Sequence, residues 1–84
     1  MLFCICQREK GTEMTETTYT NRVNAAAKNL VACHNAGKKV TYTTAWNEVF
    51  FNVFDCANHA KVDGVNRYMP DTIARVKKAA RAML

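Results

Sequence analysis

The chain has 84 residues, 49% of them apolar, with three glycines and one proline, which favours one small folded domain over a disordered chain. Its net charge is +5, and residues 61–84 contribute +4 of that, since they hold six Lys and Arg against two Asp. Such a positive cluster attracts phosphates, anionic lipid headgroups or acidic protein surfaces, and the alternative is an ordinary solvated helix face. No apolar run is long enough to cross a membrane.

The first 13 residues differ in pattern from the rest. The apolar run LFCIC at residues 2–6 is followed by charged residues and Gly11, and Met14 is followed by the polar TETTYT, which looks like a natural protein start. The run is too short for the apolar part of a secretory signal peptide. We predict that residues 1–13 are a leader, a flexible tail or an added strand outside the core, and that residues 14–84 form a single helical domain.

Residues 18–36 are predicted to form the first helix. Apolar side chains recur there at spacings of 4, 3, 4 and 3, which places them on one helical face: Tyr19, Val23, Ala26, Leu30 and Cys33. One of Thr17, Thr18 and Thr20 is expected to cap the start of the helix, and Gly37 is expected to end it.

Residues 44–60 are predicted to form the second helix. Its apolar side chains make one broad stripe: Trp46, Val49, Phe50, Val53, Phe54, Ala57 and Ala60. Such a wide stripe is typical of a central helix that is packed by both neighbours. We therefore expect Trp46 and Phe50 to be core residues, whose replacement by alanine would cost about 3–5 kcal/mol.

Residues 70–83 are predicted to form the third helix, with Pro70 and Asp71 in its first turn. Its apolar residues are spaced 3, 4 and 3: Ile73, Val76, Ala80 and Met83. Residues 39–42 and 65–68 alternate in polarity and are expected to pair as two short strands. The predicted fold is an all-α three-helix bundle with this minor two-stranded pairing.

Phe51 does not fit the apolar stripe of the second helix. It falls on the polar side, three or four residues from Asn47, Glu48 and Asp55. One interpretation is an anchor for a partner or for self-association, because exposed aromatic side chains are frequent at interfaces. The other interpretation is that Phe51 packs under the N-terminal segment.

A metal site is one candidate for the cysteines and histidines. The candidate ligands are a pair one helical turn apart and four others that could join it: Cys56 and His59, with Cys33 or His34 and with Cys4 and Cys6. The chain lacks the Cys-x₂₋₄-Cys spacing that structural zinc sites use, which argues against zinc.

Nucleophilic catalysis is the second candidate for these residues. Cys56 would need His34 or His59 as its base and Asp55 to orient that base. The three glycines are isolated and offer no phosphate-binding or oxyanion loop. We predict no enzyme activity, no metal and no cofactor, and we expect reduced cysteines in a cytoplasmic protein.

Basic side chains are the last candidate for a binding site. They are predicted on the third helix and in the loops beside the second helix: Arg75, Lys77, Lys78 and Arg81, with Lys38, Lys39, Lys61 and Arg67. Such a surface suits a phosphate backbone without sequence preference. A helix-turn-helix is disfavoured, because its helices are joined by three or four residues and the predicted gaps here are about seven and ten.

These observations predict a small non-enzymatic interaction or regulatory protein. Its basic face and Phe51 would bind the acidic surface of a larger protein stoichiometrically, as accessory or inhibitor proteins of viruses and mobile elements do, which is an analogy of build alone. The alternative is a nucleic-acid-binding module that contacts the phosphate backbone through the third helix. The aromatic content is also compatible with a homodimer, and no membrane partner is expected.

Overall fold

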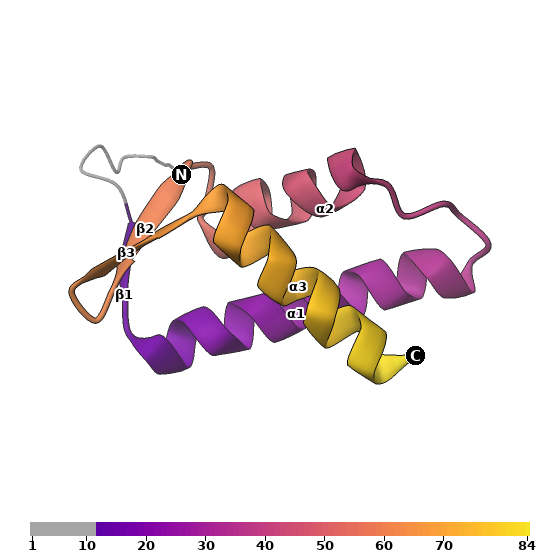
Figure 1. Ribbon diagram of the computed structural model, residues 1–84, viewed down its shortest axis with the longest axis horizontal. Helices are drawn as coiled ribbons and strands as arrows, with labels where there is room; N and C mark the ends of the chain where they lie inside the picture. The colour runs from indigo at the N-terminus through magenta and orange to yellow at the C-terminus, as the bar shows by residue number, and fades with distance from the viewer. Residues whose placement is uncertain (1–11) are drawn as a thin grey trace, which may run out of the picture.

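The computed structural model describes residues 12–84. In chain order the elements are β1 (Thr12–Met14), α1 (Glu16–Asn35), α2 (Tyr42–Glu48), the π-helical segment η2 (Val49–Val53), β2 (His59–Val62), β3 (Val65–Tyr68) and α3 (Met69–Met83). Figure 1 shows α1 and α2 side by side, α3 crossing them, and the strands gathered at one end. The fold is mainly helical with a small mixed sheet, so the all-α description was incomplete.

Local capping explains both ends of α1. The Thr15 hydroxyl accepts a hydrogen bond from the backbone N–H of Thr18, so the cap lies two residues before the earliest threonine predicted. Gly37, with φ of +83°, ends the helix as predicted. The N–H groups of Gly37 and Lys38 donate to the carbonyls of His34 and Cys33, which is the paired pattern of a Schellman motif.

The second helix starts two residues before the predicted residue 44 and ends early. Thr41 and Thr44 form a reciprocal capping box in the first turn of α2. The helix then widens into η2, ends at Val53, and is followed by bends up to residue 58. The prediction of a helix through residue 60 was wrong, and Ala57 and Ala60 do not continue its apolar stripe.

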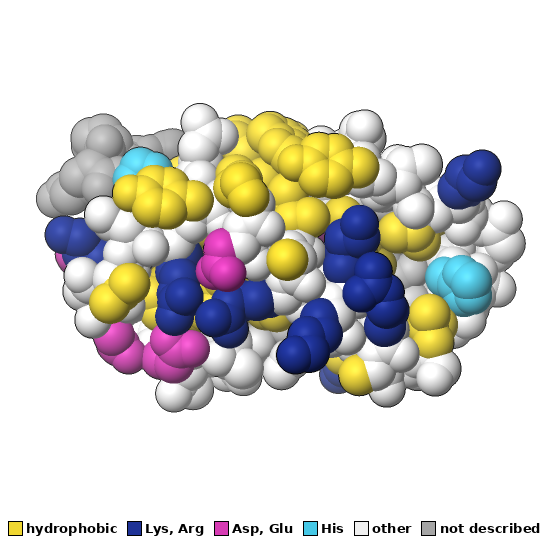
Figure 2. Space-filling view, in the orientation of Figure 1, with side chains coloured by type: hydrophobic (Ala, Val, Ile, Leu, Met, Phe, Trp, Pro, Cys, Tyr) yellow, Lys and Arg dark blue, Asp and Glu magenta, His cyan; other side chains and the backbone are white. Residues whose placement is uncertain are grey.

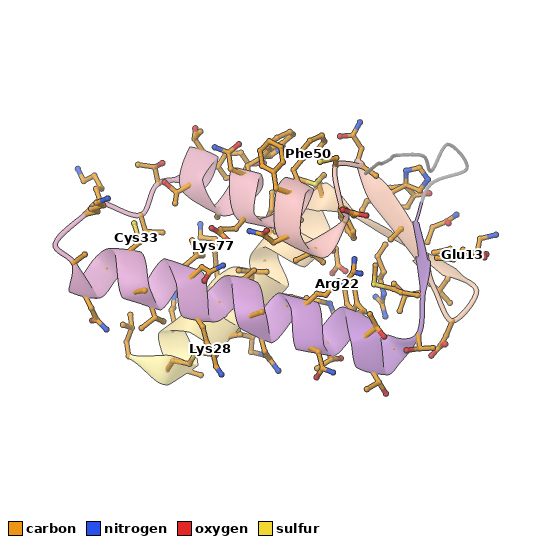
Figure 3. All side chains as sticks on the ribbon, turned by 180° about the vertical axis from the view of Figure 1, so that it is seen from behind. Glu13, Arg22, Lys28, Cys33, Phe50 and Lys77 are labelled. Carbon is orange, nitrogen blue, oxygen red and sulfur yellow. The ribbon has the colours of Figure 1, made fainter. Side chains whose placement is uncertain are left out.

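Local chemistry accounts for the early end. Residues 49–54 are all β-branched or aromatic except Asn52, and such side chains lose rotamer freedom in a helix. Asp55 and Cys56 then take positive φ angles of 55° and 68°, which a right-handed helix does not contain. The Arg22 guanidinium, seen in Figure 3, donates from α1 to the carbonyl of Val53 at 3.1 Å and satisfies this helix end.

The sheet has the strand order β1-β2-β3, with β1 parallel and β3 antiparallel to β2. Asp63 and Gly64 join β2 to β3 with φ of 49° and 84°, the conformation that favours Asp-Gly in two-residue hairpins. The predicted pairing of residues 39–42 with 65–68 was wrong. Residues 59–62 are the partner instead, because a two-residue turn closes this hairpin at a small entropic cost.

The hairpin turn also fixes the start of α1. The Asp63 carboxylate accepts a hydrogen bond from the backbone N–H of Glu16 at 3.0 Å, and the Asp63 N–H donates to the Met14 carbonyl. A carboxylate at this place also compensates the positive end of the helix dipole. Residues 1–11 lie outside the described part of the chain, whereas Thr12 and Glu13 belong to β1.

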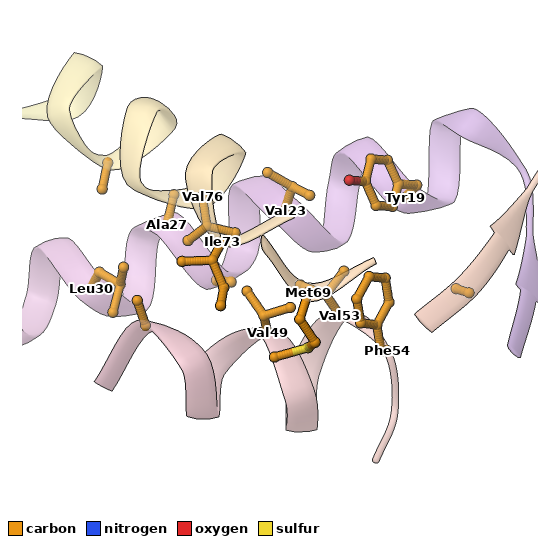
Figure 4. Close-up of a cluster of buried hydrophobic side chains, with 14 of the residues drawn as sticks. Tyr19, Val23, Ala27, Leu30, Val49, Val53, Phe54, Met69, Ile73 and Val76 are labelled. Atoms are coloured by element: carbon orange, nitrogen blue, oxygen red, sulfur yellow. The ribbon is translucent and has the colours of Figure 1, made fainter. Parts of the chain in front are cut away.

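The core lies where α1, α2 with η2, and α3 meet (Figure 4). Its large, almost fully buried side chains include Tyr19, Phe54, Val49, Val53 and Val76. Small residues of α1, Ala26 and Ala27, are fully buried as well, and they allow α3 to pack closely on α1.

Tyr19 links three elements at the sheet end of the core. Its hydroxyl forms a buried hydrogen bond of 2.8 Å with the Thr72 hydroxyl. The guanidinium groups of Arg67 and Arg75 lie 5.6 and 6.0 Å from its ring centroid. The tyrosine therefore fastens α1 to both β3 and α3.

Replacing Tyr19 by phenylalanine is expected to lower the free energy of unfolding by about 1–2 kcal/mol, because the buried Thr72 hydroxyl loses its partner. Urea denaturation would measure this. Adding Thr72→Val removes both polar groups, so the double variant should lose less than the sum of the two single variants. Strictly additive losses would contradict this interpretation of the hydrogen bond.

Candidate aromatic and basic interaction surface

Three aromatic side chains form a contiguous cluster on the outer side of α2 and η2. The rings of Trp46 and Phe50 stack with centroids 4.9 Å apart, and Phe51 meets Phe50 edge-on at 5.0 Å. Trp46 and Phe50 are half-buried, and Phe51 is 54% exposed. Figure 3 shows Phe50 pointing away from α1. We call Trp46, Phe50 and Phe51 the aromatic cluster.

The opposite side of the same helix explains why the cluster faces outward. Ala45, Val49 and Val53 are fully buried against α1 and α3. Trp46 and Phe50 pack against the edge of the core but are only half-buried, so the expectation that they are core residues is met in part. Phe51 does lie exposed, as its position on the polar side predicted.

Sequence reasoning identified one member of the cluster and missed two. Trp46 and Phe50 lie four residues apart and flank the buried stripe, so their spacing is also that of core residues. The signal that separates them from core is the short length of α2 with η2. A 12-residue rod packed on one side leaves part of its apolar circumference uncovered.

Two of the predicted basic residues are held in ion pairs. Arg67 and Arg75 lie 3.6 and 3.3 Å from the Asp71 carboxylate, and Arg67 also lies 4.0 Å from Glu16. Arg67 is half-buried, with its Nε enclosed. These two arginines stabilise the junction of β3, α1 and α3, and their charge is largely balanced within the chain.

Three other cations of α3 remain available for a partner. Lys77, Lys78 and Arg81 form no ion pair with any of residues 12–84. Figure 2 shows a row of Lys and Arg side chains over α3, directly beside the hydrophobic side chains that gather over α2. We call Lys77, Lys78 and Arg81 the basic ridge.

The remaining predicted cations lie elsewhere on the molecule. Lys61 is exposed on β2 and pairs in register with Glu13 of β1, at the sheet end. Lys38 and Lys39 are exposed in the loop after α1, at the other end. The single basic face that the sequence predicted is therefore divided into three places, of which only α3 adjoins the aromatic cluster.

An apolar groove opens between the second half of α1 and the second half of α3. It has a volume of about 130 Å³. Its apolar lining consists of Leu30, Val31, Val40, Ala80 and Leu84, and its polar lining consists of His34, Lys77 and Arg81. A second hollow of about 340 Å³ lies between α1 and α3 nearer the sheet, beside Tyr19, Arg75 and Lys78.

Within its described part, the structure does not bring together the cysteines and histidines that were weighed as candidate metal ligands. Cys56 lies in the bends after η2 and His59 opens β2, so they are not one helical turn apart. In residues 12–84 no group of three or more His, Cys, Asp or Glu side chains is placed to hold a metal ion. Cys33 and Cys56 are free thiols, whereas the candidates Cys4 and Cys6 lie outside the described residues.

The chain was compared with known protein families, curated proteins and solved structures. No protein family, no curated protein and no solved structure matches the chain. Among residues 12–84, none of the helices combines the length and apolar character needed to cross a bilayer.

Proposed function

We propose that this chain is a small non-enzymatic interaction protein, of the accessory or inhibitor type, that binds a larger protein stoichiometrically. The observation that carries the proposal is the aromatic cluster, whose Phe51 ring is more exposed than buried. Clustered aromatic side chains are the usual anchors of protein interfaces, since they bury a large area and lose little conformational entropy.

The basic ridge gives the proposed partner its chemistry. Lys77, Lys78 and Arg81 lie on the element next to the cluster and have no acidic partner among residues 12–84. An apolar pocket bordered by carboxylates on a larger protein would match both parts of this surface. The charges would speed association and fix orientation, while the aromatic rings would supply most of the affinity.

Nucleic acid is the second candidate partner, and the ridge of unpaired cations supports it. The cluster favours it less, because Trp46 and Phe50 stack on each other and offer fewer free ring faces to bases. Three phosphate contacts would make affinity fall about 20- to 40-fold between 50 and 200 mM salt. Fluorescence anisotropy with labelled single- and double-stranded DNA and RNA would measure this slope, and flat or absent binding at low salt would remove this candidate.

Trp46 gives a direct test of the protein partner, because it is the only tryptophan and belongs to the cluster. The immobilised protein would first capture binders from a nuclease-treated lysate of its source cells. The purified partner would then be titrated while Trp46 emission is recorded. We expect a blue shift that saturates at one equivalent.

Three results would overturn the proposal. The first is that nuclease treatment removes all captured material. The second is that a captured partner binds without changing Trp46 emission. The third is a blue shift that grows with protein concentration alone, which would indicate that the cluster serves a homodimer instead.

A further inference from the structure

The apolar groove between α1 and α3 is a second candidate binding site. It lies where the second half of α3 crosses α1 (Figure 1), and Lys77 and Arg81 belong both to its lining and to the basic ridge. Most of its lining is apolar, and no Asp or Glu is among the lining residues. An apolar groove with cations at its edge suits a ligand that has an apolar side chain next to negatively charged groups.

The hollow of the groove has the size of a single side chain. A cavity of about 150 Å³ lined by apolar side chains accepts one benzene-sized group. At about 130 Å³, the hollow of this groove is of similar size and matches one large apolar side chain.

We propose that this groove is a docking site for a peptide segment of the protein partner, in which one large apolar side chain is flanked by carboxylates. The apolar side chain contacts Leu30, Val31 and Val40, and the flanking carboxylates pair with Lys77 and Arg81. This inference rests on the proposed function, and it adds a second anchor to the one that the aromatic cluster supplies.

Lys77 is the residue that lies between the two proposed anchors, the groove and the aromatic cluster. Figure 3 shows this side chain in the region between α1 and α2, and the groove and the ridge both contain it. A partner seated on the cluster of α2 and η2 would therefore have to extend over α3 to reach the edge of the groove at Lys77. The two sites together extend the interface across three helices.

Short blocked peptides test the groove without the partner. The first peptide has a central leucine with two glutamates on each side, the second replaces leucine by alanine, and the third replaces the glutamates by lysines. Each would be titrated into the full-length ¹⁵N-labelled protein while amide chemical shifts are followed. We expect the first peptide to shift the amides of Leu30, Val31, His34 and Arg81, and the second to bind at least about tenfold more weakly. The third should not bind.

Charge reversal in the protein supplies the matched comparison. Arg81→Glu changes an exposed side chain of the groove, and Lys61→Glu makes the same change on the sheet. We expect Arg81→Glu to weaken binding of the first peptide at least about fivefold, and Lys61→Glu to leave it unchanged. Well-dispersed amide spectra would confirm that both variants fold.

Several outcomes would overturn the docking site. These are equal binding of the leucine and alanine peptides, equal binding of the acidic and basic peptides, and shifts that map outside the groove. Absence of binding by the first peptide would also overturn it. If the partner still shifts Trp46 emission in that case, the groove inference fails and the proposed function stands.

Discussion

Replacing Phe54 by alanine is expected to lower the free energy of unfolding by about 3–5 kcal/mol. Phe54 is fully buried beside Val49 and Val53, at the point where η2 ends. Its removal leaves a cavity that the surrounding helices cannot fill without moving. Domains of this kind have only about 5–15 kcal/mol of stability in total, so the variant would lose a large share of it.

Trp46→Ala is the control variant, because its loss of stability is expected to be smaller than that of Phe54→Ala. From sequence alone, Trp46 and Phe50 were expected to carry a cost of this size. Because Trp46 is half-buried in the structure, we now expect its replacement to cost about 1–2 kcal/mol. Urea denaturation followed by far-UV circular dichroism would measure both variants. Equal losses for Phe54→Ala and Trp46→Ala would contradict the assignment of Phe54 to the buried core and of Trp46 to its half-buried edge.

Replacing Phe51 by glutamate is expected to weaken binding of the protein partner about 30-fold or more, which corresponds to the loss of an interface anchor worth about 2 kcal/mol. The native protein should tolerate the change, since Phe51 is 54% exposed and surface substitutions alter stability by about 0.5 kcal/mol. Isothermal titration calorimetry with the purified partner would measure the affinity, and urea denaturation would confirm the stability.

Tyr68→Glu is the matched control for Phe51→Glu. Tyr68 has the same exposed fraction, 54%, and is also aromatic, but it lies on β3 beside His59. It should leave the affinity unchanged. A partner that loses affinity for Tyr68→Glu and keeps it for Phe51→Glu would place the interface on the sheet, and the aromatic cluster would then be only part of the packing of α2.

The helix ends show how far local sequence determines this fold. Gly37 ends α1 because it takes a positive φ at no steric cost, and Pro70 sits in the first turn of α3 because that turn needs no N–H from it. The apolar spacing from Tyr19 to Leu30 predicts the buried face of α1 correctly. Each of these signals acts over a few residues, so the linear sequence contains it in full.

The tertiary structure decided the features that depend on distant residues. Whether residues 59–62 continue a helix or form a strand depends on β1 and β3, and these strands supply the hydrogen bonds of β2 from both sides. The exposure of Trp46 and Phe50 depends on which side of α2 the helices α1 and α3 cover. The pairing of Arg67 with Glu16 depends on where β3 lies against the start of α1. By itself the sequence determined helix content, helix caps and an excess of cations near its end. Packing decided which aromatic side chains and which cations remain free to bind, because burial is a property of neighbours in space.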